Sequence, residues 1–265
     1  MNRTSISDIK MKAKDNLLGC YGLAAGSFAL LFALMYGLMF ILMGALSKGM
    51  SMAELSSGNL TTITRIEQIG ISLVIGVFSA ILTTGFTYQM MEVSYGRRPK
   101  ISGLFYCFKN HPDKVIIIYA ILTAIQFIVM LPSEMVNFSM ENVLTGEDGK
   151  KFLLKVVLIL AGFLINAFFT IIFGFCFLIY IDDPEMSVKD IMMCSQKLMK
   201  GNFFRYIYLF LSFIGYYVAG IFSLGVTLMY SVPYQNMAMV EFYKDALKCA
   251  DERRTEGVSS DEIGI

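Results

Sequence analysis

The densest group of acidic side chains in the sequence is Asp182-Asp183-Pro184-Glu185. Paired carboxylates of this kind can bind a magnesium ion together with a phosphate group. The alternative is structural, because acidic side chains that precede a helix stabilise its amino-terminal end. A helical pattern does follow from Ser187, so the sequence favours the structural interpretation of Asp182 and Asp183.

The other residues that could do chemistry are scattered. His111 is the single histidine, and the five cysteines include no Cys-x-x-Cys pair. Zinc sites need several His or Cys ligands at short spacing, and a hydrolytic triad needs an acid that orients its histidine. Nucleotide-binding and metalloprotease motifs are also missing from the sequence. We therefore predict no catalytic residue, no cofactor and no metal site.

The composition indicates a membrane protein. Of the 265 residues, 56% are hydrophobic and 16% are charged, against about 45–50% and about 25% in soluble domains. The mean hydropathy is +0.62 and the net charge is +1. These values exclude a disordered chain, a nucleic-acid-binding protein driven by net charge and an ordinary soluble enzyme. The chain is predicted to be all-α, because only helices satisfy their own backbone within lipid at this composition.

Long runs without Asp, Glu, Lys or Arg mark the candidate spans, since a helix crosses a bilayer with about 20 apolar residues. The runs are 16–47, 68–91, 115–133, 156–181 and 206–240. The last contains 35 residues and is too long for one upright span. A turn at Ser223-Leu224-Gly225 would divide this region into spans 203–222 and 226–245, which makes six spans in all. The alternative is one long tilted helix and five spans.

Charge placement distinguishes these alternatives, because cytoplasmic flanks carry the excess of Lys and Arg. Six spans would place 17 of the 22 cations on one side, whereas five spans would place only 13 there. We therefore predict six transmembrane helices arranged as three hairpins, with both termini in the cytoplasm.

Three amphipathic segments precede the predicted hairpins. Ser5 caps a helix over 5–18, Ser187 caps a helix that continues to Lys200, and 101–109 is a shorter candidate. We expect such a helix to lie flat in the cytoplasmic interface with its apolar side towards lipid.

The equal spacing of Gly19, Asn110 and Gly201, at intervals of 91 residues, suggests a threefold repeat. The expected units are about 5–91, 101–181 and 187–245, within a single membrane domain over 1–250. A flexible cytoplasmic tail is expected over 251–265.

The predicted spans have no ionisable residue near their centres, which argues against a proton-coupled carrier. Four amide side chains remain as candidates for a polar cavity or for contacts between helices: Gln126, Asn166, Gln235 and Asn236. The pairs Gly22/Gly26 and Gly215/Ala219 predict close helix contacts, because small residues let helices approach each other.

The carboxyl-terminal third carries the motifs of a recognisable family. These residues are Asp182-Asp183-Pro184, Gly201, Gly215 and Pro233-Tyr234. Their order resembles that of an uncharacterised integral membrane family of Firmicutes, classed as a domain of unknown function. That family is distantly similar to the membrane domain of glycerophosphodiester phosphodiesterases, whose catalytic barrel this chain lacks. The resemblance implies six spans, a bacterial plasma membrane location and no catalytic residue that could be carried over.

The leading hypothesis is a non-enzymatic plasma-membrane protein, an accessory or scaffold for envelope or transport machinery. Its expected partners are the lipid bilayer and another membrane protein, and no nucleic acid. The alternative is a permease or lipid-handling protein with a cavity between its hairpins, lined by Gln126, Asn166 or Gln235. A third hypothesis, a lipid-active enzyme, would use Asp182 and Asp183.

Overall fold

The structure is a computed structural model that describes residues 4–49, 62–136 and 149–262. The described residues form helices and contain no strand, so the all-α prediction is confirmed. The elements are α1 (Ile6–Leu17), α2 (Tyr21–Gly49), α4 (Thr62–Ser94), η1 (Ile101–Phe105), α5 (Tyr106–Lys109), α6 (Pro112–Met135), α8 (Gly149–Ile172), α9 (Cys176–Asp182), α10 (Val188–Met199), α11 (Phe203–Leu211), α12 (Ile214–Phe222) and α13 (Leu228–Glu262).

Five helical segments among the described residues are long and apolar enough to cross a membrane. They are Tyr21–Gly44, Ile69–Ser94, Pro112–Ser133, Gly149–Asp182 and Phe203–Phe222. The predicted sixth span, 226–245, falls in α13 and is not among them. Its hydropathy is lower because it carries Glu241, Lys244 and Asp245.

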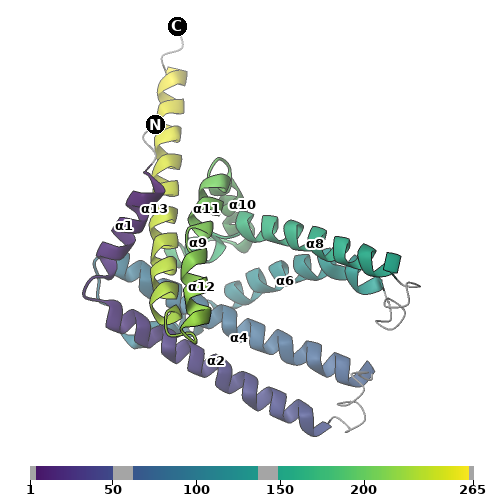
Figure 1. The fold of residues 1–265 in the computed structure, drawn as a ribbon. Helices are drawn as coiled ribbons and strands as arrows, with labels where there is room; N and C mark the ends of the chain where they lie inside the picture. The colour runs from purple at the N-terminus through teal and green to yellow at the C-terminus, as the bar shows by residue number, and fades with distance from the viewer. Residues whose placement is uncertain (1–3, 50–61, 137–148, 263–265) are drawn as a thin grey trace.

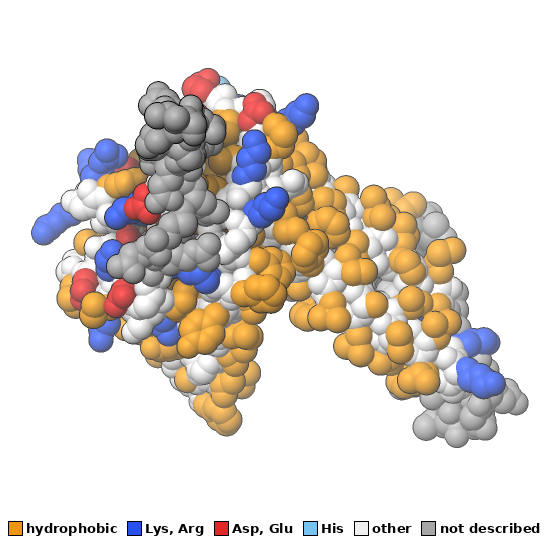
Figure 2. Space-filling view, turned by 90° about the horizontal axis from the view of Figure 1, so that it is seen from above, with side chains coloured by type: hydrophobic (Ala, Val, Ile, Leu, Met, Phe, Trp, Pro, Cys, Tyr) orange, Lys and Arg blue, Asp and Glu red, His pale blue; other side chains and the backbone are white. Residues whose placement is uncertain are grey.

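The long helices diverge from a shared centre (Figure 1). We call α2 with α4 the first arm, α6 with α8 the second arm, and α11 and α12 with the start of α13 the third arm. The hub consists of α1, α9, α10 and residues 231–246 of α13. Met237, Ala238, Val240 and Phe242 of α13 are fully buried there. Figure 2 shows hydrophobic side chains covering the arms, whereas most of the visible charged side chains gather over the hub.

The amphipathic helix α1 forms as the sequence predicts, with the Ser5 hydroxyl accepting a hydrogen bond from the Asp8 amide at 3.1 Å. Its apolar face does not point towards lipid, and this expectation is wrong. Ile9, Ala13 and Leu17 are at most 1% exposed. The helix packs along α13, which offers an apolar surface that removes this face from solvent.

The helix α10 is likewise capped by Ser187, whose hydroxyl accepts a hydrogen bond from the Asp190 amide at 3.2 Å. Its residues Ile191, Leu198 and Met199 are buried. The third predicted helix, 101–109, is instead a 3₁₀ turn, η1, followed by the single turn of α5.

Two of the predicted spans are interrupted. The fourth is divided between α8 and α9 by residues 173–175, and the fifth is divided between α11 and α12 by residues 212–213. The predicted turn after the fifth span is present, with left-handed backbone at Leu224 (φ 52°) and Gly225 (φ 89°). Beyond the hub, α13 remains helical through Glu262, where the sequence predicted a flexible tail.

The long helices α2, α6 and α11 begin at Tyr21, Pro112 and Phe203, at intervals of 91 residues. Before α2 and α11, Gly19 (φ 83°) and Gly201 (φ 89°) occupy left-handed backbone that an L side chain adopts only with strain. The threefold repeat itself stays a prediction.

The small-residue pairs do not form close helix contacts, so that prediction is wrong. A Cβ added at Gly22, Gly26 or Gly215 would meet no atom within 4 Å outside its own helix. The close approach occurs instead at Gly85 of α4, where an added Cβ would overlap the backbone carbonyl oxygen of Leu104 in η1. The Gly-x-x-x-small pattern could not reveal this contact, because its partner is a 3₁₀ turn.

Candidate functional site

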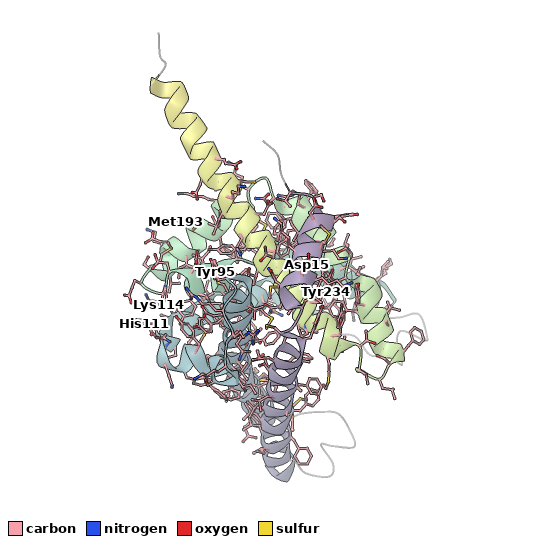
Figure 3. All side chains as sticks on the ribbon, turned by 90° about the vertical axis from the view of Figure 1, so that its left-hand side faces the viewer. Asp15, Tyr95, His111, Lys114, Met193 and Tyr234 are labelled. Carbon is pink, nitrogen blue, oxygen red and sulfur yellow. The ribbon has the colours of Figure 1, made fainter. Side chains whose placement is uncertain are left out.

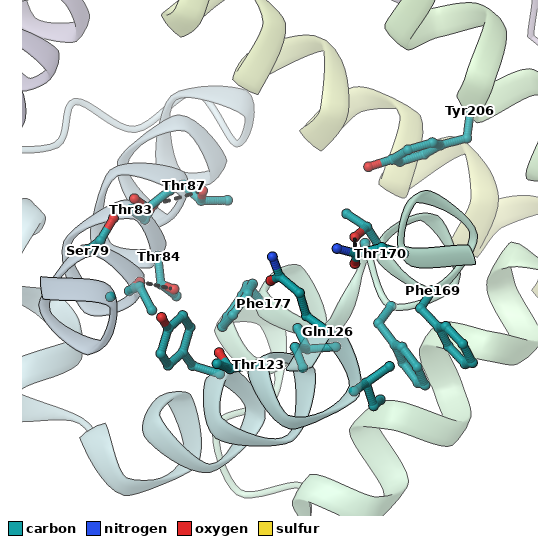
Figure 4. A pocket seen from close by; sticks show the side chains of 18 residues that line it. Ser79, Thr83, Thr84, Thr87, Thr123, Gln126, Phe169, Thr170, Phe177 and Tyr206 are labelled. Carbon is teal, nitrogen blue, oxygen red and sulfur yellow. Dashed lines mark hydrogen bonds between the residues drawn. The ribbon is translucent and has the colours of Figure 1, made fainter. Parts of the chain in front are cut away.

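A cavity of about 530 Å³ lies between α4, α6, α8, α9 and α11 (Figure 4). Its lining comes from helices of all three arms and from the hub helix α9. The lining residues are Gly76, Ser79, Ala80, Thr83, Thr84, Thr87, Tyr119, Leu122, Thr123, Ile125, Gln126, Asn166, Phe169, Thr170, Phe173, Gly174, Phe177 and Tyr206.

The wall on α4 is a stripe of hydroxyl groups. Ser79, Thr83 and Thr87 recur every four residues and therefore share one face of the helix. The Thr84 hydroxyl donates to the Ala80 carbonyl at 2.7 Å, and the Thr87 hydroxyl donates to the Thr83 carbonyl at 3.0 Å. Because their protons are committed to the backbone, these two hydroxyls present lone pairs that can accept hydrogen bonds.

Two of the four predicted amide residues face this stripe across the cavity. Gln126 comes from α6 and Asn166 from α8, and the Thr170 hydroxyl lies 3.5 Å from the Asn166 carbonyl oxygen. The Gln126 side chain points into the open space in Figure 4. Their sequence separation of 40 residues gave no indication that they share a site, since only the pairing of α6 with α8 brings them together.

A third wall is aromatic. Phe169 and Phe173 of the α8 region stack with their ring centroids 6.4 Å apart and their planes 6° from parallel. Phe177 of α9 lies on the same lining, and Tyr206 of α11 brings a phenol hydroxyl towards Gly174. The interruption between α8 and α9 places these aromatic residues around one hollow.

The lining contains no charged residue, and its polar groups are hydroxyls and amides. Thr83, Gln126 and Thr170 are exposed, so the hollow can be reached from outside the protein. Pockets of a few hundred Å³ with apolar walls and a few polar groups are typical ligand sites. The arrangement can bind an uncharged molecule but offers no group that could act as a nucleophile or strong general base at neutral pH.

The other two predicted amides lie outside the cavity. Gln235 accepts a hydrogen bond from the Tyr217 hydroxyl of α12. The Asn236 amide donates to the Thr87 hydroxyl at 3.3 Å, so α13 is hydrogen-bonded to the hydroxyl stripe. Asn236 therefore contacts a residue of the cavity wall but does not itself line the cavity.

The acidic cluster is built into the fold. Asp182 accepts hydrogen bonds from the hydroxyls of Tyr95 at 3.4 Å and Tyr243 at 3.2 Å, and Asp183 accepts one from the Glu185 amide at 3.1 Å. No group of three His, Cys, Asp or Glu side chains suited to a metal ion occurs in the part of the chain that the structure describes. His111 directly precedes α6, and its imidazole lies 3.4 Å from the Glu185 carboxylate.

Two of the five remaining motif residues, Pro184 and Tyr234, make hydrogen bonds within the hub. The Pro184 carbonyl accepts a hydrogen bond from Lys114, and Tyr234 donates to the Lys10 carbonyl at 3.2 Å (Figure 3). Pro233 lies within α13, and Gly201 forms the turn before α11. Gly215 is exposed on α12 and makes no close contact.

Sequence reasoning missed the charged network of the hub. The Glu241 carboxylate, only 9% exposed, accepts hydrogen bonds from Asn16 at 2.9 Å and from Ser94. Lys244 lies 3.5 Å from Glu241 and donates to the Ser94 hydroxyl at 2.8 Å. The available signal was the trio of charges in 226–245, a segment that the hydrophobic pattern had marked as a span.

Sequence reasoning also missed the hydroxyl stripe of α4. The signal was present, because Ser79, Thr83 and Thr87 recur with helical spacing in an apolar run. Threonine in a membrane helix often bonds to its own backbone, so this spacing did not by itself indicate a cavity.

Comparison with known proteins gives one family. No curated protein and no solved structure matches the chain. The model of the family described as "Protein of unknown function (DUF975)" matches residues 1–250, which covers all three arms and the hub. This chain, with its hydroxyl- and amide-lined cavity between apolar helices, therefore belongs to the DUF975 family.

Proposed function

We propose that this protein is a permease or lipid-handling protein of the bacterial plasma membrane and that it binds its ligand in the cavity between the arms. The observation that carries this proposal is the position of Gln126 and Asn166 on the wall of one accessible cavity. A tightly packed bundle would instead have paired these amides with neighbouring helices. The activity we propose is binding or passage of a molecule, without covalent catalysis.

We propose six spans arranged as three hairpins, with both termini in the cytoplasm. The ion pair between Arg205 and Asp245, at 2.7 Å, supports this topology because it joins the start of α11 to α13. Further polar contacts in the hub join the ends of the other arms, such as Ser94 to Glu241 and Lys114 to Pro184. Ends that meet at one place are expected to lie on one side of a membrane, and an even number of crossings is consistent with this arrangement.

A scaffold role is the second candidate, and a groove on the hub favours it. The groove encloses about 420 Å³ between α10 and α13, and its lining includes Met186, Met193 and Leu198. Its two methionines are flexible apolar side chains that can adapt to a partner protein, and they lie beside the charged Asp190 and Lys197. A partner seated there would make the protein an accessory of a larger membrane assembly.

Native mass spectrometry in mild detergent tests the binding function. The unmodified protein is expected to retain a lipid-sized adduct after washing, and Thr83→Phe, which fills the cavity, should lose it. Ile69→Phe is the matched control, because Ile69 lies on the same helix, is 57% exposed and does not line the cavity.

Equal adducts on both variants, or no adduct on any form, would contradict the binding function. A stoichiometric protein partner that remains bound to Thr83→Phe and carries no lipid would support the scaffold instead.

A further inference from the structure

We infer that the cavity selects an uncharged group that bears several hydroxyls, a polyol such as a sugar ring, either free or as the headgroup of a lipid. This inference rests on the proposed binding function and names the chemical class of its ligand. It follows from three properties of the lining: its lack of charge, its balance of hydrogen-bond donors and acceptors, and its aromatic wall.

The lack of charge excludes ionic ligands. The lining residues include no Lys, Arg, His, Asp or Glu. A phosphate or ammonium group that enters a hollow among membrane helices loses hydration and finds no opposite charge, which disfavours its binding in a medium of low polarity. A neutral group loses only hydrogen bonds to water, and the lining can replace these.

The hydrogen-bonding pattern requires a ligand that both donates and accepts. The Thr84 and Thr87 hydroxyls have given their protons to the backbone and can only accept from a ligand. The Gln126 and Tyr206 side chains have no hydrogen-bond partner in the described residues, and both can donate as well as accept. Hydroxyl groups are the simplest neutral groups that satisfy both kinds of partner at once.

The aromatic wall adds a preference for a ring or chain with an apolar face. Phe169 lies on the opposite side of the hollow from the hydroxyl stripe of α4 in Figure 4, and Phe173 and Phe177 also line the hollow. A sugar ring has hydroxyls at its edge and C–H bonds on its faces, so it matches both walls. The volume of about 530 Å³ exceeds that of one such ring and leaves room for the first segment of an attached acyl chain.

A single-tryptophan variant provides the test, because the chain contains no tryptophan. Phe169→Trp places the probe in the cavity wall, and the full-length variant is studied in phosphatidylcholine nanodiscs. The titrants are a monoglucosyl diacylglycerol, a phosphatidic acid with the same acyl chains, and methyl β-glucoside in solution. We expect the neutral glucolipid to change the tryptophan emission saturably and the phosphatidic acid to leave it unchanged. Methyl β-glucoside alone should act only if the free polyol is the ligand.

Two hydroxyl deletions on α11 provide matched variants in the Phe169→Trp background. Tyr206→Phe removes a hydroxyl of the cavity and should weaken glucolipid binding about three- to tenfold, the usual effect of one lost hydrogen bond. Tyr208→Phe removes a hydroxyl from a side chain that is 63% exposed and lies outside the lining, so it should leave binding unchanged. Gln126→Leu should act like Tyr206→Phe.

Equal or tighter binding of phosphatidic acid would overturn the inference, as would unchanged glucolipid binding in both Tyr206→Phe and Gln126→Leu. Brominated phosphatidylcholine separates these failures from failure of the binding function itself. If the brominated lipid quenches the tryptophan of Phe169→Trp but neither the glucolipid nor methyl β-glucoside reduces this quenching, the cavity accepts lipid and only the polyol inference is overturned. If Thr83→Phe leaves the quenching unaltered as well, the cavity takes up no ligand and both proposals fall.

Discussion

Arg205 and Asp245 form an ion pair at 2.7 Å, although 40 residues and the whole third arm separate them along the chain. The Arg205 guanidinium also donates to the Thr4 carbonyl at 2.7 Å and lies over the Phe242 ring. The pair thus fixes the start of α11, the middle of α13 and the amino-terminal segment at one level of the molecule.

The first prediction concerns topology. A reporter fused after Pro99 and one fused after Ala250 should report the same, cytoplasmic side, because polar contacts of the hub join the chain near both positions. A paired assay with alkaline phosphatase and green fluorescent protein measures this. Opposite readings at the two positions would restore the five-span alternative.

The second prediction concerns the stability of this ion pair. The side chains of Arg205 and Asp245 are only 17% and 9% exposed, so Asp245→Asn leaves a largely buried guanidinium without its counter-charge. Removing one partner of such a pair costs about 3–5 kcal/mol. We expect a markedly lower melting temperature, measured by size-exclusion chromatography after heating in detergent.

The ion pair between Arg97 and Glu92 is the matched control. Its length is also 2.7 Å, but the Arg97 side chain is 68% exposed. Exposed ion pairs contribute at most about 1 kcal/mol to stability, so the Arg97→Gln variant should have a melting temperature close to that of the unmodified protein. Equal decreases in melting temperature for both variants would show that burial does not determine how much these ion pairs contribute to stability.

The third prediction concerns the contact between α4 and η1. Gly85→Ala should destabilise the protein strongly, because the new Cβ overlaps the Leu104 carbonyl oxygen and backbone atoms cannot move aside cheaply. Gly26→Ala places the same methyl group on α2 in open space and should keep or slightly raise stability, by up to about 1 kcal/mol. Thermal unfolding of the two variants gives the comparison, and equal melting temperatures would refute the close contact.

The fourth prediction concerns thiol reactivity. Cys107 in α5 is fully buried, and burial raises the pKa of its thiol to about 12. Since the thiolate is the reactive form, Cys107 should resist N-ethylmaleimide at pH 8 and gain little reactivity up to pH 10. Cys20 and Cys194 are partly exposed and should be labelled before Cys107. Peptide mapping of the native and detergent-denatured protein checks this order, and early labelling of Cys107 would contradict its burial.

Much of the local structure could be predicted from the sequence. The caps at Ser5 and Ser187 and the turn at Leu224–Gly225 depend on neighbouring residues alone, and all three are present. The apolar runs likewise marked the five membrane-competent helices. The surface against which α1 packs could not be predicted, because an amphipathic face is equally suited to lipid and to another helix. It packs on α13, whose hub segment carries buried apolar side chains such as Met237 and Ala238.

The residues of the candidate site could likewise be predicted only in part from the sequence. Gln126 and Asn166 stood out as polar residues in apolar runs, and both line the cavity. Gln235 stood out for the same reason but contacts Tyr217 instead. Which polar residues share a space depends on how the arms pack, and periodicity within one helix carries no information about that.

The sequence by itself determined that this protein is an α-helical chain with several segments suited to a membrane, because hydropathy and charge are local properties. The tertiary structure alone decided that Glu241 and Asp245 face the hub and that hydroxyls of α4 share a cavity with amides of α6 and α8. A buried charge is tolerated where its partners are, and the partners of Glu241 and Asp245 come from distant parts of the chain.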